Sequence, residues 1–317
     1  MTAVPSPQRA AAPHAALDRA GPWVDRVFRA QATLIYLFLY VPIGLVVLFS
    51  FNAGEHTGEL RGVSARWYSY ALNDRFAMGA LQNSFVVGIW TSLLATSLGT
   101  IAALALQRAT PRVRAIFDAM TYVAIIIPGI VIGIATLIFF VNIFGFVNPW
   151  LDFVWKTAGL GTPPVIGKGL HTVIAAHVLF TMAIVMVLVR TRLAGMDRTL
   201  TEASFDLFAT PFRTFTQVTL PQLRPAIIAG ALLAFTFSFD DFVIANFVAG
   251  PGQPTLPMYV FNSIRRGITP EINAIASMVL AVTVTALIVV GLIFRRQARQ
   301  AGERSQVPVA MGIAEDA

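Results

Sequence analysis

Charged residues and cysteines are scarce in this chain. Asp, Glu, Lys and Arg make up 12% of its 317 residues, while 56% are hydrophobic, and a soluble domain carries about 25% charged residues. There is no cysteine, which excludes disulfide bonds, thiolate metal sites and a cysteine nucleophile. The mean hydropathy of +0.70 indicates an integral membrane protein. The net charge of +7 does not indicate nucleic-acid binding, because the basic residues gather in alternate loops.

Motifs for nucleotide, metal or catalytic chemistry are also missing. Gly167-Lys168 lacks the upstream glycine spacing of a phosphate loop, and Gly169 stands where Ser or Thr is needed. His171 and His177 are six residues apart, so they point to different helix faces, and no carboxylate cluster accompanies them. We predict no catalytic residue, metal or cofactor, and for the histidines a hydrogen-bonded contact between helices.

Six apolar segments are long enough to cross a bilayer, which takes about 20 residues as a helix. Lipid offers backbone groups no partners, so these segments must be helical. The sequence therefore predicts an all-α polytopic membrane protein with six transmembrane helices. Disordered tails are expected at 1–30, which lacks the apolar core of a signal peptide, and at 297–317, around a membrane domain at 31–296. The six spans are expected at residues 31–51, 82–106, 119–143, 170–190, 225–248 and 273–294.

Basic residues are distributed unevenly among the segments that join the spans. With the N-terminus in the cytoplasm, most of the 23 Lys and Arg residues fall on the cytoplasmic side, many of them in the loop at 191–224 and its flanks. Basic residues close to spans favour that side of the membrane. We predict a multi-pass membrane protein with both termini in the cytoplasm.

Proline and glycine interrupt the third span. Pro128 predicts a kink in that helix. Gly129 and Gly133 are four residues apart, a spacing that allows close approach of a neighbouring helix. We interpret all three as structural residues and not as part of a binding site.

The loop at 191–224 contains a short helix that is polar on one face. Glu202 and Asp206 are four residues apart, so they share that face. Leu200, Ala203 and Leu207 recur at helical spacing on the other side. The pattern predicts an amphipathic helix held at the membrane surface.

A second short helix is predicted after Thr210, a hydroxyl cap that precedes Pro211 at the first helical position. Phe212 and Phe215 place an apolar stripe on it. Because proline has no N–H group, Pro221 is expected to end this helix.

These residues resemble the cytoplasmic coupling loop of binding-protein-dependent ABC importers. Glu202-Ala203-Ser204 takes the place of the family's E-A-A, and Val218-Thr219-Leu220-Pro221 takes the place of its I-x-L-P ending. Phe208 departs from the family, which has a glycine there that turns the backbone with positive φ. The resemblance assigns coupling to the ATPase to Glu202, Ala203, Ser204, Asp206, Leu207, Phe208, Ala209, Phe212, Phe215, Leu220 and Pro221.

Two adjacent carboxylates, Asp240 and Asp241, lie in the fifth apolar span. A charged residue near the centre of a span costs about 2.5–3.5 kcal/mol on insertion scales, so lipid exposure is disfavoured. Successive residues of a helix diverge by about 100°, so one of the two is expected to face any single cavity. We predict a substrate pathway at Ser238, Phe239, Asp240 and Asp241, and we keep a helix contact with a partner subunit as the alternative role for one of these carboxylates.

The segment from the carboxylates to the last span, which includes F-D-D-F-V-I-A and I-R-R-G-I-T-P-E-I-N-A, resembles permease subunits of spermidine/putrescine-type importers. The resemblance covers about residues 31–296 and implies the MetI-like fold, with a polyamine moved by alternating access. It also implies three partners beside membrane lipid: a second related permease, a cytoplasmic ATPase dimer that hydrolyses the ATP, and a periplasmic substrate-binding protein.

Two other functions stay open at this point. The chain fits an importer of the same family for another solute, such as an aminophosphonate, an opine or iron. It also fits, less well, a stand-alone channel or secondary carrier, although no clear internal repeat of the kind found in many carriers is present.

Overall fold

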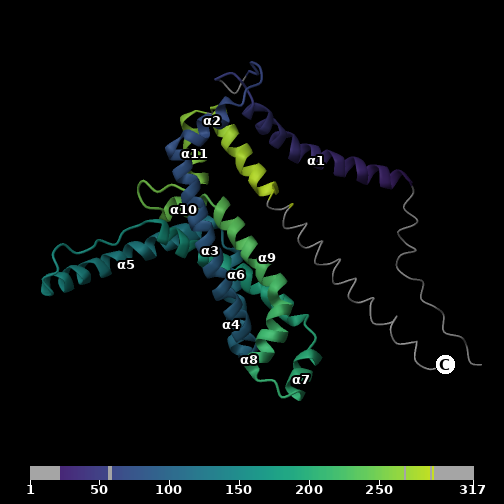
Figure 1. Ribbon diagram of the computed structural model, residues 1–317, viewed down its shortest axis with the longest axis vertical. Coiled ribbons are helices and arrows are strands. Elements are labelled where there is room, and N and C mark those ends of the chain that lie inside the picture. The colour runs from purple at the N-terminus through teal and green to yellow at the C-terminus, as the bar shows by residue number, and fades with distance from the viewer. Residues whose placement is uncertain (1–21, 56–58, 268, 286–287, 289–317) are drawn as a thin grey trace, which may run out of the picture. The chain divides into compact units, whose positions relative to one another are not determined.

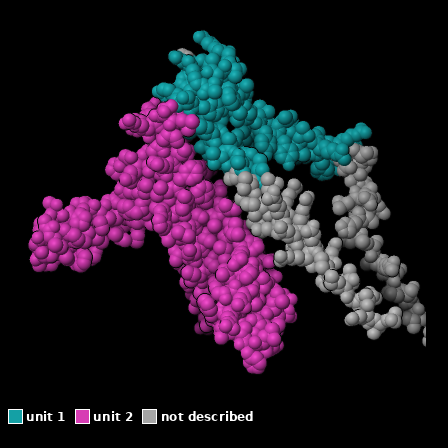
Figure 2. Space-filling view, in the orientation of Figure 1, with its two compact units in different colours: residues 1–70, 269–317 teal, residues 71–268 magenta. Residues whose placement is uncertain are grey.

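The computed structural model describes residues 22–55, 59–267, 269–285 and 288. They divide into two compact units, Met1–Tyr70 with Thr269–Ala317, and Ala71–Ile268 (Figure 2). The described parts are almost entirely helical. In chain order the helices are α1 (Pro22–Ser50), α2 (Arg66–Asn73), α3 (Arg75–Gln107), α4 (Pro111–Ile126), α5 (Gly129–Thr157), α6 (Leu170–Ala194), α7 (Thr199–Asp206), α8 (Pro211–Thr214), the π-helix η2 (Phe215–Thr219), α9 (Leu220–Asp240), α10 (Val243–Val248) and α11 (Leu256–Arg266), followed by an apolar helix at Pro270–Thr285.

The second unit is built on three long helices, α3, α6 and α9, that pack along one another (Figure 1). Their shared core holds Val185 and Val189 of α6 and Leu223 of α9. Small residues allow the close approach: a Cβ added to Gly99 of α3 would lie 2.9 Å from the backbone oxygen of Met182 in α6. The bundle therefore depends on apolar burial together with glycine at its tightest crossing.

The predicted third span is divided between two helices. α4 ends at Ile126, and α5 begins after Pro128 and points away from the three-helix bundle (Figure 1). The expected kink at Pro128 is therefore a full break, because the residue before a proline is driven into extended backbone, as Ile127 is with ψ of 129°. α5 then continues as far as Thr157.

α5 packs against the short helix α10. A Cβ added to Gly133 would lie 2.7 Å from the ring of Phe247, whereas one at Gly129 would find its neighbours at 3.8 Å or more. Close packing was predicted for both glycines, and it is Gly133 that requires the absence of a side chain.

Within the described residues, five helices are long and apolar enough to cross a membrane: Arg26–Ser50, Arg75–Gln107, Gly129–Thr157, Leu170–Ala194 and Pro211–Asp240. The sixth predicted span begins as the shorter apolar helix Pro270–Thr285, and most of the residues after it lie outside the described part. The predicted all-α polytopic fold is confirmed.

The predicted boundary of the N-terminal tail needs correction. α1 begins at Pro22, so residues 22–30, which were assigned to a disordered tail, are helical. The rest of that tail, residues 1–21, and the predicted C-terminal tail at 297–317 lie outside the described residues.

Residues Asn83 and Ser84 of α3 hold the segment that leads into α11. The side-chain amide of Asn83 donates to the backbone oxygen of Pro254 at 3.0 Å, and the hydroxyl of Ser84 accepts from the backbone N–H of Leu256 at 2.8 Å. Ser84 thereby satisfies an N–H group at the first turn of α11 that has no partner within the helix. These two bonds fix the start of α11 against α3.

Candidate functional site

The loop between α6 and α9 folds into two short helices, as predicted. α7 carries Ser204 and α8 carries Thr214, and their hydroxyl oxygens are hydrogen-bonded at 2.9 Å. Thr210 caps α8 as expected, because its hydroxyl accepts from the backbone N–H of Arg213 at 3.4 Å. The loop is therefore a closed hairpin of two helices.

Phe208 turns the chain between these helices in the left-handed conformation. Its φ is +58°, and among the described residues other than glycine no second residue has a positive φ. Its N–H donates to Phe205 at 2.9 Å, and the N–H of Ala209 donates back to Ser204 at 3.1 Å. These two bonds form the Schellman end of α7, in which glycine is usual at the position of Phe208. The family's turn geometry is retained at a cost of about 1–2 kcal/mol for the bulky residue.

The predicted coupling residues differ in their exposure. Leu207, Phe208 and Phe212 are 81%, 95% and 76% exposed. Phe215, which was predicted to share an exposed stripe with Phe212, is half-buried. The exposed members also include Glu202, Ala203 and Asp206, while Ser204, Ala209, Leu220 and Pro221 are partly exposed or exposed at the base of the hairpin.

The predicted helix end at Pro221 is wrong. α8, η2 and α9 form one continuous run, in which the N–H of Leu220 bonds to the oxygen of Phe215, five residues back. A π-turn of this kind places an extra residue in the helix. The π-turn that precedes Pro221 rearranges the backbone hydrogen bonds of the helix and so accommodates the missing proline N–H.

The carboxylate pair stands at a break and not inside a continuous span. α9 ends at Asp240, Asp241 adopts extended backbone with ψ of 122°, and α10 starts at Val243. An oxygen of Asp241 accepts from the N–H of Ala245 at 3.0 Å, which satisfies an N–H in the first turn of α10. The expectation of a helix over 225–248 is corrected by this break, which gives the two carboxylates different surroundings.

Asp241 is partnered from another span. The Nε2 atom of His177 in α6 lies 3.2 Å from an oxygen of Asp241, a separation typical of an ion pair, although the N–H does not point squarely at that oxygen. The Nδ1 atom of the same ring is 2.8 Å from the hydroxyl oxygen of Ser238. The predicted helix contact of this histidine is thus present. The single carboxylate beside it was not foreseen, because Asp241 comes from a distant part of the sequence.

Asp240 has a more open environment. Asp240 is exposed, and no residue in the described part of the chain forms a hydrogen bond with its carboxylate. Phe239, which precedes it, stacks with Phe235 at 5.5 Å between ring centres and meets Phe85 edge-on at 5.2 Å. Ser238, Phe239 and Asp241 therefore face helix neighbours, and Asp240 is the predicted pathway residue left available.

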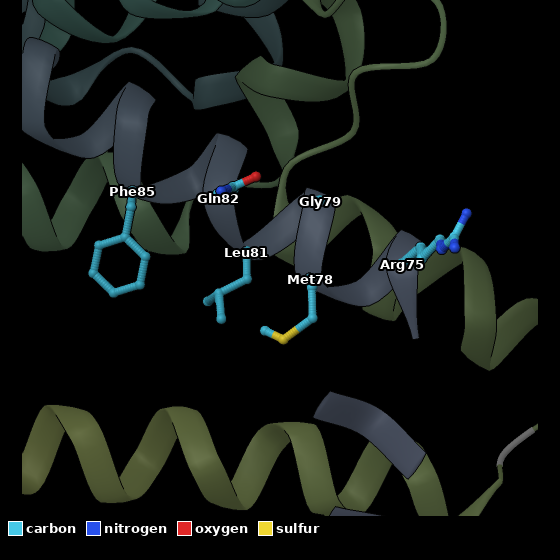
Figure 3. Close-up of a pocket in the computed structure, with 6 residues that line it drawn as sticks. All are labelled: Arg75, Met78, Gly79, Leu81, Gln82 and Phe85. Carbon is cyan, nitrogen blue, oxygen red and sulfur yellow. The ribbon is translucent and has the colours of Figure 1, made fainter. Parts of the chain in front are cut away.

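A hollow of about 440 Å³ runs along the first part of α3 (Figure 3). Its apolar wall reaches Phe85, the ring that also contacts Phe239, the residue before the carboxylate pair. The lining residues are Arg75, Met78, Gly79, Leu81, Gln82 and Phe85. Sequence reasoning did not identify them, because their pattern is that of any apolar helix. Within the described residues no group of three His, Asp or Glu side chains is arranged to hold a metal ion.

Comparison with known proteins identifies the family. Residues 95–301 match the model of the "Binding-protein-dependent transport system inner membrane component". The chain is 40% identical over 247 residues to the putrescine transport system permease protein PotI of Escherichia coli K12, covering 77% of this chain and 82% of that protein. It is 32% identical over 263 residues to the spermidine/putrescine permease protein PotC of the same strain, covering 83% and 92%.

Solved structures agree on the fold. A chain of a bacterial ABC transporter that imports the acidic polysaccharide alginate matches with a TM-score of 0.67 at 14% identity, covering 90% of this chain and 99% of that one. At this identity the likeness concerns the fold alone. Together with the family match and the polytopic helices, it leads to one conclusion: the chain belongs to the family of inner-membrane permease components of binding-protein-dependent ABC importers.

Proposed function

We propose that this permease subunit forms part of the pathway by which a polyamine of the putrescine/spermidine class enters the cell. The observation that carries the proposal is the exposed carboxylate of Asp240, which ends the apolar helix α9 and has no hydrogen-bond partner among the residues that the structure describes. A carboxylate at such a place costs free energy unless it serves a cation. The names of the relatives PotI and PotC support a polyamine as that cation.

Transport in this proposal is alternating access driven by partners. A second, related permease completes the pathway, a cytoplasmic ATPase dimer supplies the energy, and a periplasmic binding protein delivers the solute. Both termini and the α7–α8 hairpin lie in the cytoplasm, as the basic residues indicate. The proposed membrane domain covers about residues 31–296, together with residues 22–30 at the start of α1. The hairpin belongs to the coupling loop of this domain at 191–224.

The hairpin suits the role of the coupling element. Its exposed side chains Leu207, Phe208 and Phe212 form an apolar surface on a polar loop, and a few aromatic anchors of this kind usually dominate an interface. Glu202 and Asp206 add a negative rim. Closure of the ATPase dimer would move the hairpin, and the continuous helix from Pro211 to Asp240 extends from it to the carboxylate pair.

Uptake of labelled putrescine and spermidine into vesicles that contain the assembled transporter tests the function. We expect Asp240→Asn, which removes the charge at nearly constant shape, to lower uptake about tenfold with an unchanged amount of complex. Uptake by the Asp240→Asn complex equal to that of the unsubstituted one would refute the pathway role. Identification of an aminophosphonate, opine or iron complex as the ligand of the cognate binding protein would replace the polyamine with that solute.

A further inference from the structure

His177 is a buried ionisable side chain that neither the coupling role nor the pathway role uses. It lies in α6 and is 1% exposed. Both of its ring nitrogens face residues at the end of α9, namely Ser238 at 2.8 Å and Asp241 at 3.2 Å. Ser238 is itself buried, at 3% exposure. Burial of a polar ring costs free energy unless its nitrogen atoms have partners. Nδ1 has the hydrogen bond with Ser238, and Nε2 has the electrostatic contact with Asp241.

The contacts favour one proton arrangement at Nε2. A neutral imidazole carries one N–H group, and the other nitrogen presents a lone pair. With the proton on Nδ1 alone, the Nε2 lone pair would face the Asp241 carboxylate and repel it. A proton on Nε2 removes this repulsion, and the hydroxyl of Ser238 then donates to Nδ1, or accepts from it when the ring is fully protonated. In either form the Nε2–H group lies beside the Asp241 carboxylate at 3.2 Å, out of line for a hydrogen bond but close enough for electrostatic attraction.

Asp241 is therefore bound from two directions. His177 approaches it from α6, while the N–H of Ala245 donates to it from α10. The carboxylate thereby joins α6 to both sides of the break between α9 and α10. Its neighbour Asp240 has neither contact. The side chains of two adjacent residues thus differ in how tightly they are held. The difference originates in His177, which lies more than sixty positions earlier in the sequence.

We propose that His177 is a positioning residue, which holds Asp241 at the break so that Asp240 alone of the pair meets the transported cation. This inference rests on the proposed polyamine function. It specifies that this subunit offers the solute one carboxylate of the pair and not both. Without His177, Asp241 would be free to turn toward the pathway, where two adjacent negative charges would hold a dication too firmly for rapid release. Conduction requires binding weak enough for the solute to leave.

Two conservative substitutions separate the two contacts of the ring. The amide nitrogen of His177→Gln reaches the place of Nε2 and retains a donor toward Asp241. The shorter side chain of His177→Asn reaches the place of Nδ1 and retains only the contact with Ser238. Both are neutral and polar, so they match each other in charge and differ in the contact retained. The measurement is the initial rate of putrescine uptake per assembled transporter, with assembly quantified by copurification of the partner subunits.

We expect His177→Asn to lower uptake about tenfold, because it removes the close electrostatic contact with the Asp241 carboxylate, and His177→Gln to stay within about twofold of the unsubstituted transporter. Asp241→Asn combined with His177→Asn should be no slower than Asp241→Asn alone, because the two residues act through one contact. Equal rates for the Gln and Asn variants, losses that multiply in the double variant, or a loss of assembly that matches the loss of uptake would overturn the proposal. Absence of polyamine uptake by the unsubstituted transporter would instead refute the proposed function.

Discussion

Arg190 near the end of α6 forms a two-point ion pair with Asp118 of α4. The two side chains are 27% and 31% exposed, so water screens the pair only in part. The planar guanidinium matches the carboxylate in geometry, which makes this type of pair stronger than one with lysine. The contact ties α4 to α6, the helix that lies in the three-helix bundle.

Removal of this ion pair is expected to destabilise the permease. Asp118→Ala should lower the free energy of unfolding by about 1–3 kcal/mol, because it leaves a partly buried charge without its partner. Thermal unfolding of the purified transporter in detergent measures the change. The exposed pair of Lys156 and Asp152 on α5 is the matched control, and its loss should cost at most about 0.5 kcal/mol. Equal effects at both pairs would contradict the prediction.

Phe208→Gly is expected to preserve or strengthen assembly with the ATPase. Glycine adopts a positive φ without steric cost, so the substitution relieves about 1 kcal/mol of strain in the turn. Copurification of the ATPase with the permease measures the result. Phe208→Ala is the control, because it removes the ring but keeps the strained backbone. If both variants lose the ATPase, the ring occupies a pocket on the partner and the prediction for Phe208→Gly is wrong.

Phe212→Ala is expected to weaken coupling more than Phe215→Ala does at the same interface. Phe212 is 76% exposed on the hairpin, whereas Phe215 is half-buried within the chain. An anchor that becomes buried on assembly contributes about 2 kcal/mol or more. ATPase activity stimulated by the loaded binding protein measures coupling, and Glu202→Lys should lower it as well. Wild-type stimulation in the Phe212→Ala variant would show that the hairpin docks by another surface.

Gly133→Ala is expected to destabilise the packing of α5 on α10, while Gly129→Ala is tolerated. The added methyl group at Gly133 meets the ring of Phe247 at 2.7 Å, and at Gly129 it enters ordinary contact. Overpacking of this kind costs about 1–3 kcal/mol. Unfolding temperature and yield of the two variants provide the comparison. A larger loss for Gly129→Ala would show that the helices meet differently in the assembled transporter.

Membrane insertion and the helical class follow from the sequence, because long apolar runs have no other stable form in lipid. Local chemistry also determined the hairpin between α6 and α9. Thr210 followed by Pro211 starts a helix wherever it occurs. The motif around Glu202 was likewise enough to identify the family.

Local patterns were insufficient at the proline and carboxylate positions. Pro128 was expected to kink a helix and breaks it, while Pro221 was expected to end a helix and lies within a continuous one. The outcome depends on whether neighbouring turns rearrange to satisfy the freed backbone groups. A π-turn before Pro221 does so, and no equivalent turn precedes Pro128.

The sequence by itself determined that two carboxylates interrupt an apolar segment, because their cost in lipid depends only on residue type and depth. Only the tertiary structure decided that they differ. Packing of α6 against α9 brings His177 to Asp241 and Ser238 and leaves Asp240 exposed. Hydrogen bonds and ion pairs act over a few ångströms, and these residues are separated by more than sixty positions in the chain. The fold, and no local pattern, therefore assigns each carboxylate its partner.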